Sequence, residues 1–194
     1  MAKKNARNTR GKIVNAAWKL FYEQGYEDTT VEEIIELSGT SKGSFYHYFD
    51  GKDALLSTLS SLFDEKYEEL TGLLTPEMTA MEQLLFLNRE LFHMIEDSIS
   101  LDLLARLYST QLTTNGEKHL LDHNRIYYKL LRKIIAKGQA EGQLSSRSNV
   151  NEMVKLYALC ERALLYDWCL CAGEYALTEY SAKVLPGFLS SFLP

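Results

Sequence analysis

The segment from Gly39 to Lys52 gathers side chains that suit contact with a polyanion. Hydroxyl groups, an imidazole and lysine ammonium groups follow one another there, and all of them can donate hydrogen bonds. On a helix that turns by about 100° per residue, Phe45 and Phe49 share one face and Gly43 lies on the opposite face. One face is therefore apolar, and the other is small, polar and flanked by positive charge.

Gly43 occupies the middle of the polar face, although glycine inside a helix costs about 1 kcal/mol relative to alanine. The missing side chain lets another molecule approach the backbone closely. We therefore expect Lys42 and the Gly43 backbone to meet base edges in a DNA major groove. The groups expected to bind phosphates belong to Tyr46, His47, Tyr48 and Lys52. For His47, a solvated surface histidine is the alternative.

Two preceding helices would position this segment. Apolar residues at helical spacing predict a first helix over 9–25, after a frayed polar lead-in over 1–8. Thr30 followed by Glu33 forms a capping box that opens a second helix, which stops at Gly39. Two short helices that meet across a glycine turn are typical of a helix-turn-helix. The alternative, an ordinary corner between helices, is weakened because the second helix is short and aromatic on its polar side.

Positive charge is concentrated at the start of the chain. The whole chain has a formal net charge of −5, which alone disfavours binding to nucleic acid. Six basic side chains and no acidic one precede Glu23, so the remainder carries 15 basic and 26 acidic side chains. The first helix is thus basic, which favours DNA binding by this end of the chain.

Residues 9 to about 56 resemble the DNA-binding domain of the TetR/AcrR family of transcriptional regulators, over the runs 29–34 and 41–49 and at Lys52. The resemblance implies that Phe45 and Phe49 are core residues. Thr40, where the family usually has an apolar residue, and Gly51, where a Ser or Asn cap is usual, depart from the pattern. Together with the hydroxyl of Ser44, the predicted DNA-binding set is Thr30, Ser41, Lys42, Gly43, Ser44, Tyr46, His47, Tyr48 and Lys52.

The rest of the chain reads as helical, so the predicted fold class is all-α. A helix-turn-helix DNA-binding domain over 1–51 would be joined to a larger helical domain over 52–194 by one long helix that starts at Lys52 and ends near Pro76. Further helices are expected from Pro76, over 101–112, from 117 to about 140, from about 150 to 171, and from 178 to 192 with a bend or break at Pro186-Gly187.

The resemblance implies that the larger domain binds a small effector and forms a homodimer through its last two helices. Candidate pocket residues, each of which could instead be plain core, are Phe92, His93, Tyr108, Tyr127, Tyr128 and Tyr157. The expected dimer interface comprises Leu164, Leu165 and Trp168, with a place in the core of its own subunit as the alternative for Trp168.

Other functional classes find little support. The cysteines Cys160, Cys169 and Cys171 lack Cys-x-x-Cys spacing and read as reduced thiols of a cytoplasmic protein. No apolar run reaches the ~20 residues of a membrane span. His119 and His123 could reach one metal from a helix, but two histidines lack the other ligands, so an exposed helix face is favoured. The sequence has no recognisable catalytic or cofactor motif.

These features predict a transcriptional repressor that binds a palindromic DNA operator as a homodimer and is released by a small molecule. One alternative is a DNA-binding regulator or architectural protein without an effector. Another is a helical enzyme with a basic first helix, which would show turnover without DNA affinity.

Overall fold

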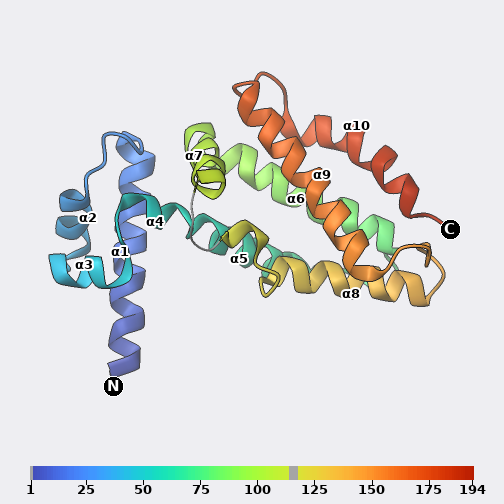
Figure 1. The fold of residues 1–194 in the computed structure, drawn as a ribbon, viewed down its shortest axis with the longest axis horizontal. Coiled ribbons are helices and arrows are strands. Elements are labelled where there is room, and N and C mark those ends of the chain that lie inside the picture. Colours follow the sequence, from blue (N-terminus) through green and yellow to red (C-terminus); the bar gives the residue numbers. More distant parts are fainter. Residues whose placement is uncertain (1, 114–117) are drawn as a thin grey trace.

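A computed structural model describes the backbone of residues 2–113 and 118–194, and side chains from Thr9 onward. The regular elements in these ranges are all helical, as the sequence predicts. Figure 1 shows α1 (Ala2–Gln24), α2 (Val31–Ser38) and α3 (Lys42–Tyr48) together at one end of the molecule. The remaining helices form the larger part of the molecule.

The helix-turn-helix forms as its caps predict. The Thr30 hydroxyl accepts a hydrogen bond from the Glu33 backbone N–H, and the Glu33 carboxylate accepts one from the Thr30 N–H. Gly39 ends α2 at φ 63°, a left-handed conformation that glycine adopts without a steric penalty. The lead-in over 1–8 was expected to be frayed, but α1 begins at Ala2.

Apolar side chains hold α3 against α1 and α2. Ile13 of α1, Ile34 of α2 and Phe45 of α3 are each 0% exposed, and Phe49 just after α3 is 4% exposed. The two phenylalanine rings pack with centroids 5.9 Å apart. The apolar face of α3 therefore fixes the direction in which its polar face points.

The predicted long connecting helix is interrupted. α4 (Lys52–Leu56) and α5 (Leu59–Thr71) are separated at Ser57 and Thr58, where backbone hydrogen bonds span three residues instead of four. The hydroxyls of Ser57 and Thr58 donate to the carbonyls of Ala54 and Leu55, at 2.7 and 2.6 Å. Hydroxyls that bond to the preceding turn compete with the helical pattern, which accounts for the break.

Tyr26, in the loop between α1 and α2, joins the small domain to the larger one. Its ring is 4% exposed and lies between the ammonium of Lys52, 4.3 Å from the centroid, and the guanidinium of Arg106, 4.9 Å from it. Its hydroxyl donates to the Asp53 carboxylate, and Arg106 also pairs with Glu27 at 2.6 Å. One side chain thus touches α4 and α7 (Leu101–Thr113) at once.

The larger domain contains α5, α6 (Ala80–Ser98), α7, α8 (Ile126–Ala140), α9 (Val150–Leu170) and α10 (Leu177–Leu189). α8 packs on α5, α6 and α9, and α10 packs on α6 and α9 (Figure 1). Two short 3-10 helices, His119–Leu121 and Ser190–Phe192, complete the described elements.

Several predicted boundaries need correction. α6 begins at Ala80, not at Pro76, because Thr79 and Glu82 form a second capping box. The expected helix from 117 begins only at Ile126; residues 114–117 lie outside the described part of the chain. α10 continues through Pro186 to Leu189, so the proline does not interrupt it.

The packing of α8 predicts a sharp difference between two helical glycines. A Cβ added at Gly138 would lie 2.6 Å from the Ala80 Cβ and 2.8 Å from Leu144 Cδ1. We expect Gly138→Ala to lower the free energy of unfolding by about 1 to 3 kcal/mol, because the crowded site must deform. Chemical denaturation followed by circular dichroism measures it.

Gly11 of α1 is the matched control, since a Cβ there would meet nothing within 4 Å. Gly11→Ala should raise the free energy of unfolding by up to about 1 kcal/mol through helix propensity. Equal effects of the two substitutions would contradict the tight packing at Gly138.

Candidate nucleic-acid interface and effector cavity

The start of α3 is built from hydroxyl groups. Ser41 caps the helix by accepting a hydrogen bond from the Ser44 backbone N–H, and the two hydroxyls lie 2.9 Å apart. Lys42 is exposed and contacts Glu32 at 3.4 Å. A surface ion pair of this kind is weak, so the Lys42 ammonium can exchange Glu32 for an acceptor on DNA.

The polar face of α3 is open to solvent. A Cβ added at Gly43 would meet only the Ser41 hydroxyl, at 4.0 Å, so the backbone is accessible there. Tyr46 is 46% exposed and His47 is exposed, whereas Tyr48 is half-buried with its ring against that of His47. The predicted residues from Ser41 to Tyr48 therefore share one short, accessible helix.

Thr30 is exposed at the start of α2, but its hydroxyl already serves the capping box. It accepts from the Glu33 N–H and donates to the Glu33 carboxylate at 2.8 Å. Its contribution to a DNA contact would come from its place at the N-terminus of α2, where backbone N–H groups attract phosphate.

Lys52 does not point toward the polar face of α3. Its ammonium donates to the carbonyls of Tyr26, Thr29 and Glu27, at 2.6, 2.9 and 3.2 Å. An ammonium has three N–H donors, and these acceptors use all of them. The prediction that Lys52 binds phosphate is therefore not supported by this geometry, which gives it the role of holding the loop between α1 and α2.

A cation that the sequence pattern did not single out lies next to α3. The exposed Arg10 of α1 stacks over the Phe49 ring, 5.4 Å from its centroid. The sequence shows that the first helix is basic, but only the packing of α1 on Phe49 identifies which of its charges lies near α3.

The larger domain contains a small cavity between α5, α6, α7, α8 and α9. Its volume is about 50 Å³. Apolar, aromatic and charged side chains line it. The lining residues are Phe63, Tyr67, Leu91, Ile95, Tyr108, Leu120, Arg125, Tyr127, Glu161, Arg162 and Leu165.

The predicted pocket residues divide into three groups. Tyr108 and Tyr127 line the cavity. Tyr128 and Tyr157 are buried beside it and donate to the carbonyls of Leu120 and Leu84, at 3.0 and 2.8 Å. Phe92 is fully buried and His93 is exposed, paired with Asp97 at 3.3 Å, and neither lines the cavity.

Glu161, which the sequence pattern did not single out, is a carboxylate in the interior. It is 4% exposed and accepts hydrogen bonds from the Tyr127 hydroxyl at 2.6 Å and the Asn88 amide at 2.9 Å. Burial raises the pKa of Glu161 above its usual range, and the hydrogen bonds from Tyr127 and Asn88 oppose that rise. A signal was present in the sequence, because Glu161 falls four residues from both Tyr157 and Leu165 on the apolar side of α9.

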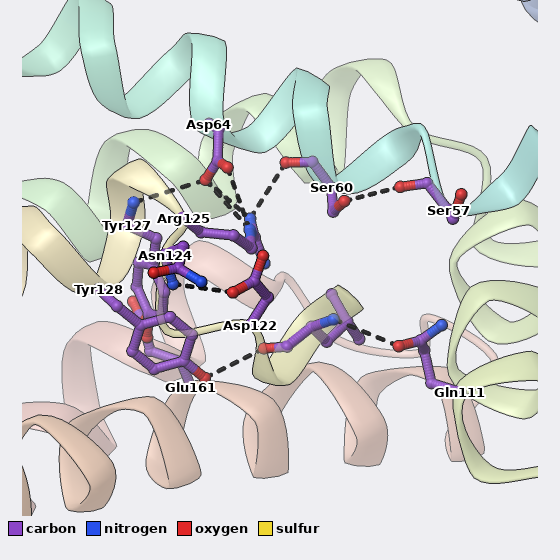
Figure 2. A network of polar contacts seen from close by, with 11 residues as sticks. Ser57, Ser60, Asp64, Gln111, Asp122, Asn124, Arg125, Tyr127, Tyr128 and Glu161 are labelled. Atoms are coloured by element: carbon purple, nitrogen blue, oxygen red, sulfur yellow. Dashed lines mark hydrogen bonds and ion pairs between the residues drawn. The ribbon is translucent and has the colours of Figure 1, made fainter. Parts of the chain in front are cut away.

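Arg125 and Asp64 form an ion pair in the wall of the cavity. Figure 2 shows Arg125 of the loop before α8 reaching Asp64 of α5 and the Ser60 carbonyl. The Nε and Nη2 groups lie 3.1 and 3.0 Å from the two carboxylate oxygens, a bidentate geometry. Their side chains are only 10% and 17% exposed, so this pair ties α8 firmly to α5.

The residues predicted at the dimer interface lie inside the subunit. Leu164, Leu165 and Trp168 are each 6% exposed, and the Trp168 indole N–H donates to the Tyr175 carbonyl at 2.9 Å. The interface prediction for these three is thus corrected, and the core alternative holds for Trp168. The large exposed apolar side chains of α9 are Leu159, Tyr166 and Leu170, at 52, 45 and 66%.

The remaining predicted groups are not brought together. His119 belongs to a 3-10 helix and His123 follows it, so the expected helix with both imidazoles on one face does not form. Among the described residues, no three metal-binding side chains gather into a possible metal site.

Burial raises the pKa of Cys160 and Cys169 to about 11, which keeps both thiols protonated at neutral pH. In the described part of the chain, no helix is long and apolar enough to cross a membrane.

Known proteins match this chain in two ways. The family described as bacterial regulatory proteins, tetR family, matches residues 13–59, which run from α1 to the start of α5. The transcriptional regulator TtgR of Pseudomonas putida is 35% identical over 68 residues, which is 35% of this chain and 32% of that protein. A Lactococcus lactis regulator is 41% identical over 58 residues, 29% of this chain and 30% of its own length, so these matches span about a third of those relatives.

Other matches extend over nearly the whole chain. The fatty acid metabolism regulator protein of Bacillus subtilis is 23% identical over 177 residues, covering 89% of this chain and 90% of its own. The structure of Thermus thermophilus FadR, a TetR-family transcriptional repressor in complex with lauroyl-CoA, is 25% identical, with a TM-score of 0.76 and 95% of each chain covered. Helix order, the helix-turn-helix and these matches agree: residues 13–59 match the tetR family of bacterial regulatory proteins, and nearly the whole chain is similar in fold to a TetR-family repressor.

Proposed function

We propose that the protein is a dimeric, cytoplasmic and non-catalytic transcriptional repressor that leaves its operator when a small molecule enters the cavity of the larger domain. The observation that carries the proposal is the exposed polar face of α3, held in one direction by Phe45 and Phe49. The similarity of nearly the whole chain to a TetR-family repressor that was solved in complex with lauroyl-CoA supports the second half of the proposal.

In this proposal the DNA contacts fall into two kinds. Lys42 and the Gly43 backbone read base edges, because they lie at the open N-terminal end of α3. Tyr46 and His47 donate to phosphates, and Arg10 takes the phosphate-binding role first expected of Lys52.

The proposed dimer uses the exposed apolar side chains of α9. Leu159, Tyr166 and Leu170 follow one another at intervals of seven and four residues, so they lie on one side of the helix. A second copy that packs α9 against α9 would cover all three, and the two-fold symmetry suits a palindromic operator.

Two contacts could transmit a movement of the cavity wall to the helix-turn-helix domain of α1 to α3, here called the reading head. α7 carries Tyr108 in the cavity wall and, two residues earlier, Arg106 against Tyr26 and Glu27 of the small domain. On the other side, Arg125 lines the cavity and binds the Ser60 carbonyl beside the break between α4 and α5 (Figure 2). A ligand that moves either wall would change the angle of the head, provided that it binds the two angles unequally.

The test of the proposal is a mobility-shift experiment with the DNA upstream of the protein's own gene and its neighbours. We expect a specific complex that competitor DNA of random sequence does not displace at equal concentration. Catalytic turnover without DNA affinity would refute the proposal. Tight DNA binding that no small molecule weakens would favour a regulator or architectural protein without an effector.

Lys42, Arg10 and Lys52 should respond differently to substitution. Lys42→Ala should lose discrimination between operator and random DNA by about 1 to 3 kcal/mol per base contact. Arg10→Ala should weaken binding to all sequences, and the slope of log affinity against log salt should fall by about one unit for each phosphate that is no longer neutralised. Fluorescence anisotropy titrations at several salt concentrations measure both effects.

Lys52→Met should act mainly on folding, since three carbonyl acceptors lose their charged donor. We expect the free energy of unfolding to fall by about 2 kcal/mol, with the salt slope unchanged. A lower salt slope in a variant of native stability would return Lys52 to its first assignment as a phosphate anchor.

The Arg106 contact should control how strictly the two heads keep their spacing. Arg106→Ala removes the guanidinium from Tyr26 and Glu27, so each head can turn more freely. We expect about a tenfold loss of discrimination between the natural operator and one with a single inserted base pair, a change within the usual range of coupling energies. Arg89→Ala, which removes another exposed Arg–Glu pair far from the head in sequence, should leave the discrimination unchanged.

The dimer proposal separates two neighbouring aromatic residues of α9. Tyr166→Glu should give a folded, helical monomer, because the exposed ring leaves its own core intact. Trp168→Glu should lower the melting temperature and the helicity together, since burying a charge in place of a core indole costs several kcal/mol. Sedimentation and circular dichroism distinguish the outcomes, and a stable Tyr166→Glu dimer would exclude this surface.

A further inference from the structure

The charges in the cavity narrow the class of effector. We propose that the effector is an apolar molecule with an amine or another organic cation, and that Glu161 and the tyrosines around it bind its positive charge. The inference rests on the proposed role of the cavity as the effector site. It is carried by the arrangement of Glu161, the arginines and the aromatic rings.

Glu161 is hydrogen-bonded, but no cationic side chain among the described residues contacts it directly. Tyr127 and Asn88 donate to its two oxygens, at 2.6 and 2.9 Å. Among the described side chains, no lysine, arginine or histidine nitrogen forms a salt bridge with it. A buried carboxylate without a cation is costly, so a ligand that supplies the cation gains from the pairing.

Neither of the two arginines of the cavity wall forms an ion pair with Glu161. Arg125 forms the bidentate pair with Asp64, so that its charge is compensated. Arg162 is half-buried, and its guanidinium donates to the Tyr128 hydroxyl at 3.2 Å. Arg162 forms no ion pair among the described residues, and its charge favours the ionised form of Glu161. An anionic ligand would be attracted by Arg162 and repelled by Glu161, whereas a cationic ligand can pair directly with Glu161, which no described protein cation contacts.

Aromatic rings surround the carboxylate. Tyr67 and Tyr127 both line the cavity, with ring centroids 4.9 Å apart, and Tyr108 lines it from α7. The faces of such rings attract organic cations, most strongly where water is excluded. The apolar remainder of the wall, including Phe63 and Leu91, suits a hydrocarbon body attached to the charge.

The cavity must widen to take such a molecule. Its volume of about 50 Å³ has room for a few water molecules, whereas pockets for drug-sized ligands measure about 300 to 1,000 Å³. Entry must therefore displace a wall. Tyr108 belongs to the same helix as Arg106, so displacement of α7 would reach the contact with the small domain.

The affinity for a cation should depend on pH through the protonation of Glu161. Burial raises the pKa of Glu161, so part of the protein holds a neutral acid as the pH falls. A cation binds the ionised form, so its affinity should rise with pH through that raised pKa and then level off. Burial raises the pKa of the neighbouring tyrosines and of the neighbouring thiol, so these groups stay protonated over this range; they are Tyr67, Tyr108, Tyr127, Tyr157 and Cys160. The charged groups near Glu161 are Arg162 and the Asp64–Arg125 ion pair.

The experiment compares three soluble molecules with the same hydrocarbon body and different charge: phenylbutylamine, phenylbutanol and phenylbutyrate. Isothermal titration of the full-length protein, without DNA, should show the amine binding most tightly. Glu161→Gln keeps the size and a hydrogen-bonding oxygen but removes the charge. We expect it to weaken amine binding by at least about tenfold, equivalent to about 1.4 kcal/mol, while phenylbutanol binding stays within about twofold.

Glu68→Gln, which removes an exposed carboxylate of α5, is the control and should leave all three affinities unchanged. If Glu161→Gln unfolds by circular dichroism, the rise of amine affinity with pH in the unmodified protein tests the same claim. A pH-independent affinity then overturns it.

Three results would overturn the inference: no amine binding at millimolar concentration, unchanged amine binding in a folded Glu161→Gln variant, or tighter binding of phenylbutyrate or lauroyl-CoA than of the amine. Failure of the repressor proposal looks different. An amine that binds through Glu161 but does not release operator DNA would leave this inference intact and refute release by cavity occupation.

Discussion

The position of the reading head depends on the enclosure of Tyr26. Two cations over the tyrosine ring and a carboxylate at its hydroxyl fix the loop between α1 and α2 against α4, which supplies Lys52 and Asp53, and α7, which supplies Arg106. Burial and the bond to Asp53 raise the pKa of Tyr26, so the hydroxyl remains a proton donor throughout the physiological range. The head is thus attached to the larger domain by a compact polar joint and not only by the connecting chain.

Polar groups also fix the interior of the larger domain. Glu161 of α9 is bound through Asn88 of α6 to Ser181 of α10, and Asp64 of α5 is bound to Arg125 before α8. Each of these contacts links different helices at one register, which apolar packing alone does less strictly. Breaking one partner of such a buried pair leaves the other uncompensated, so these contacts resist small rearrangements.

Local sequence signals predicted the small domain well. The capping box at Thr30, the glycine at Gly39 and the spacing of Phe45 and Phe49 act within a few residues, and the structure follows them. The same local signals do not reveal the position of the Lys52 ammonium. Its acceptors are carbonyls of a loop more than twenty residues away in sequence, and no spacing rule reports where that loop lies.

The larger domain was harder to predict because its helices are long, apolar on several sides and similar to one another. A first-turn proline at Pro76 outweighed the better signal, the capping pair of Thr79 and Glu82. The sequence around Trp168 is apolar nearly all round and so predicts an interface, yet the structure encloses Trp168 within its own subunit. Glu161 shows that a single charged residue on the apolar face of a helix is as good a signal of a cavity residue as an aromatic residue is.

The break at Ser57 and Thr58 has a geometric consequence for the reading helix. Each residue of an α-helix turns the chain by about 100° and advances it by about 1.5 Å. The hydrogen-bond pattern at Ser57 and Thr58 therefore sets how far the helices before the break are rotated about the axis of α5. Here the Ser57 and Thr58 hydroxyls stabilise that pattern by donating to backbone carbonyls. The Trp18 indole N–H in turn donates to the Thr58 hydroxyl at 2.9 Å. The orientation of α3 relative to α5 therefore depends on a few side-chain hydrogen bonds at this break, in addition to the contacts of Tyr26.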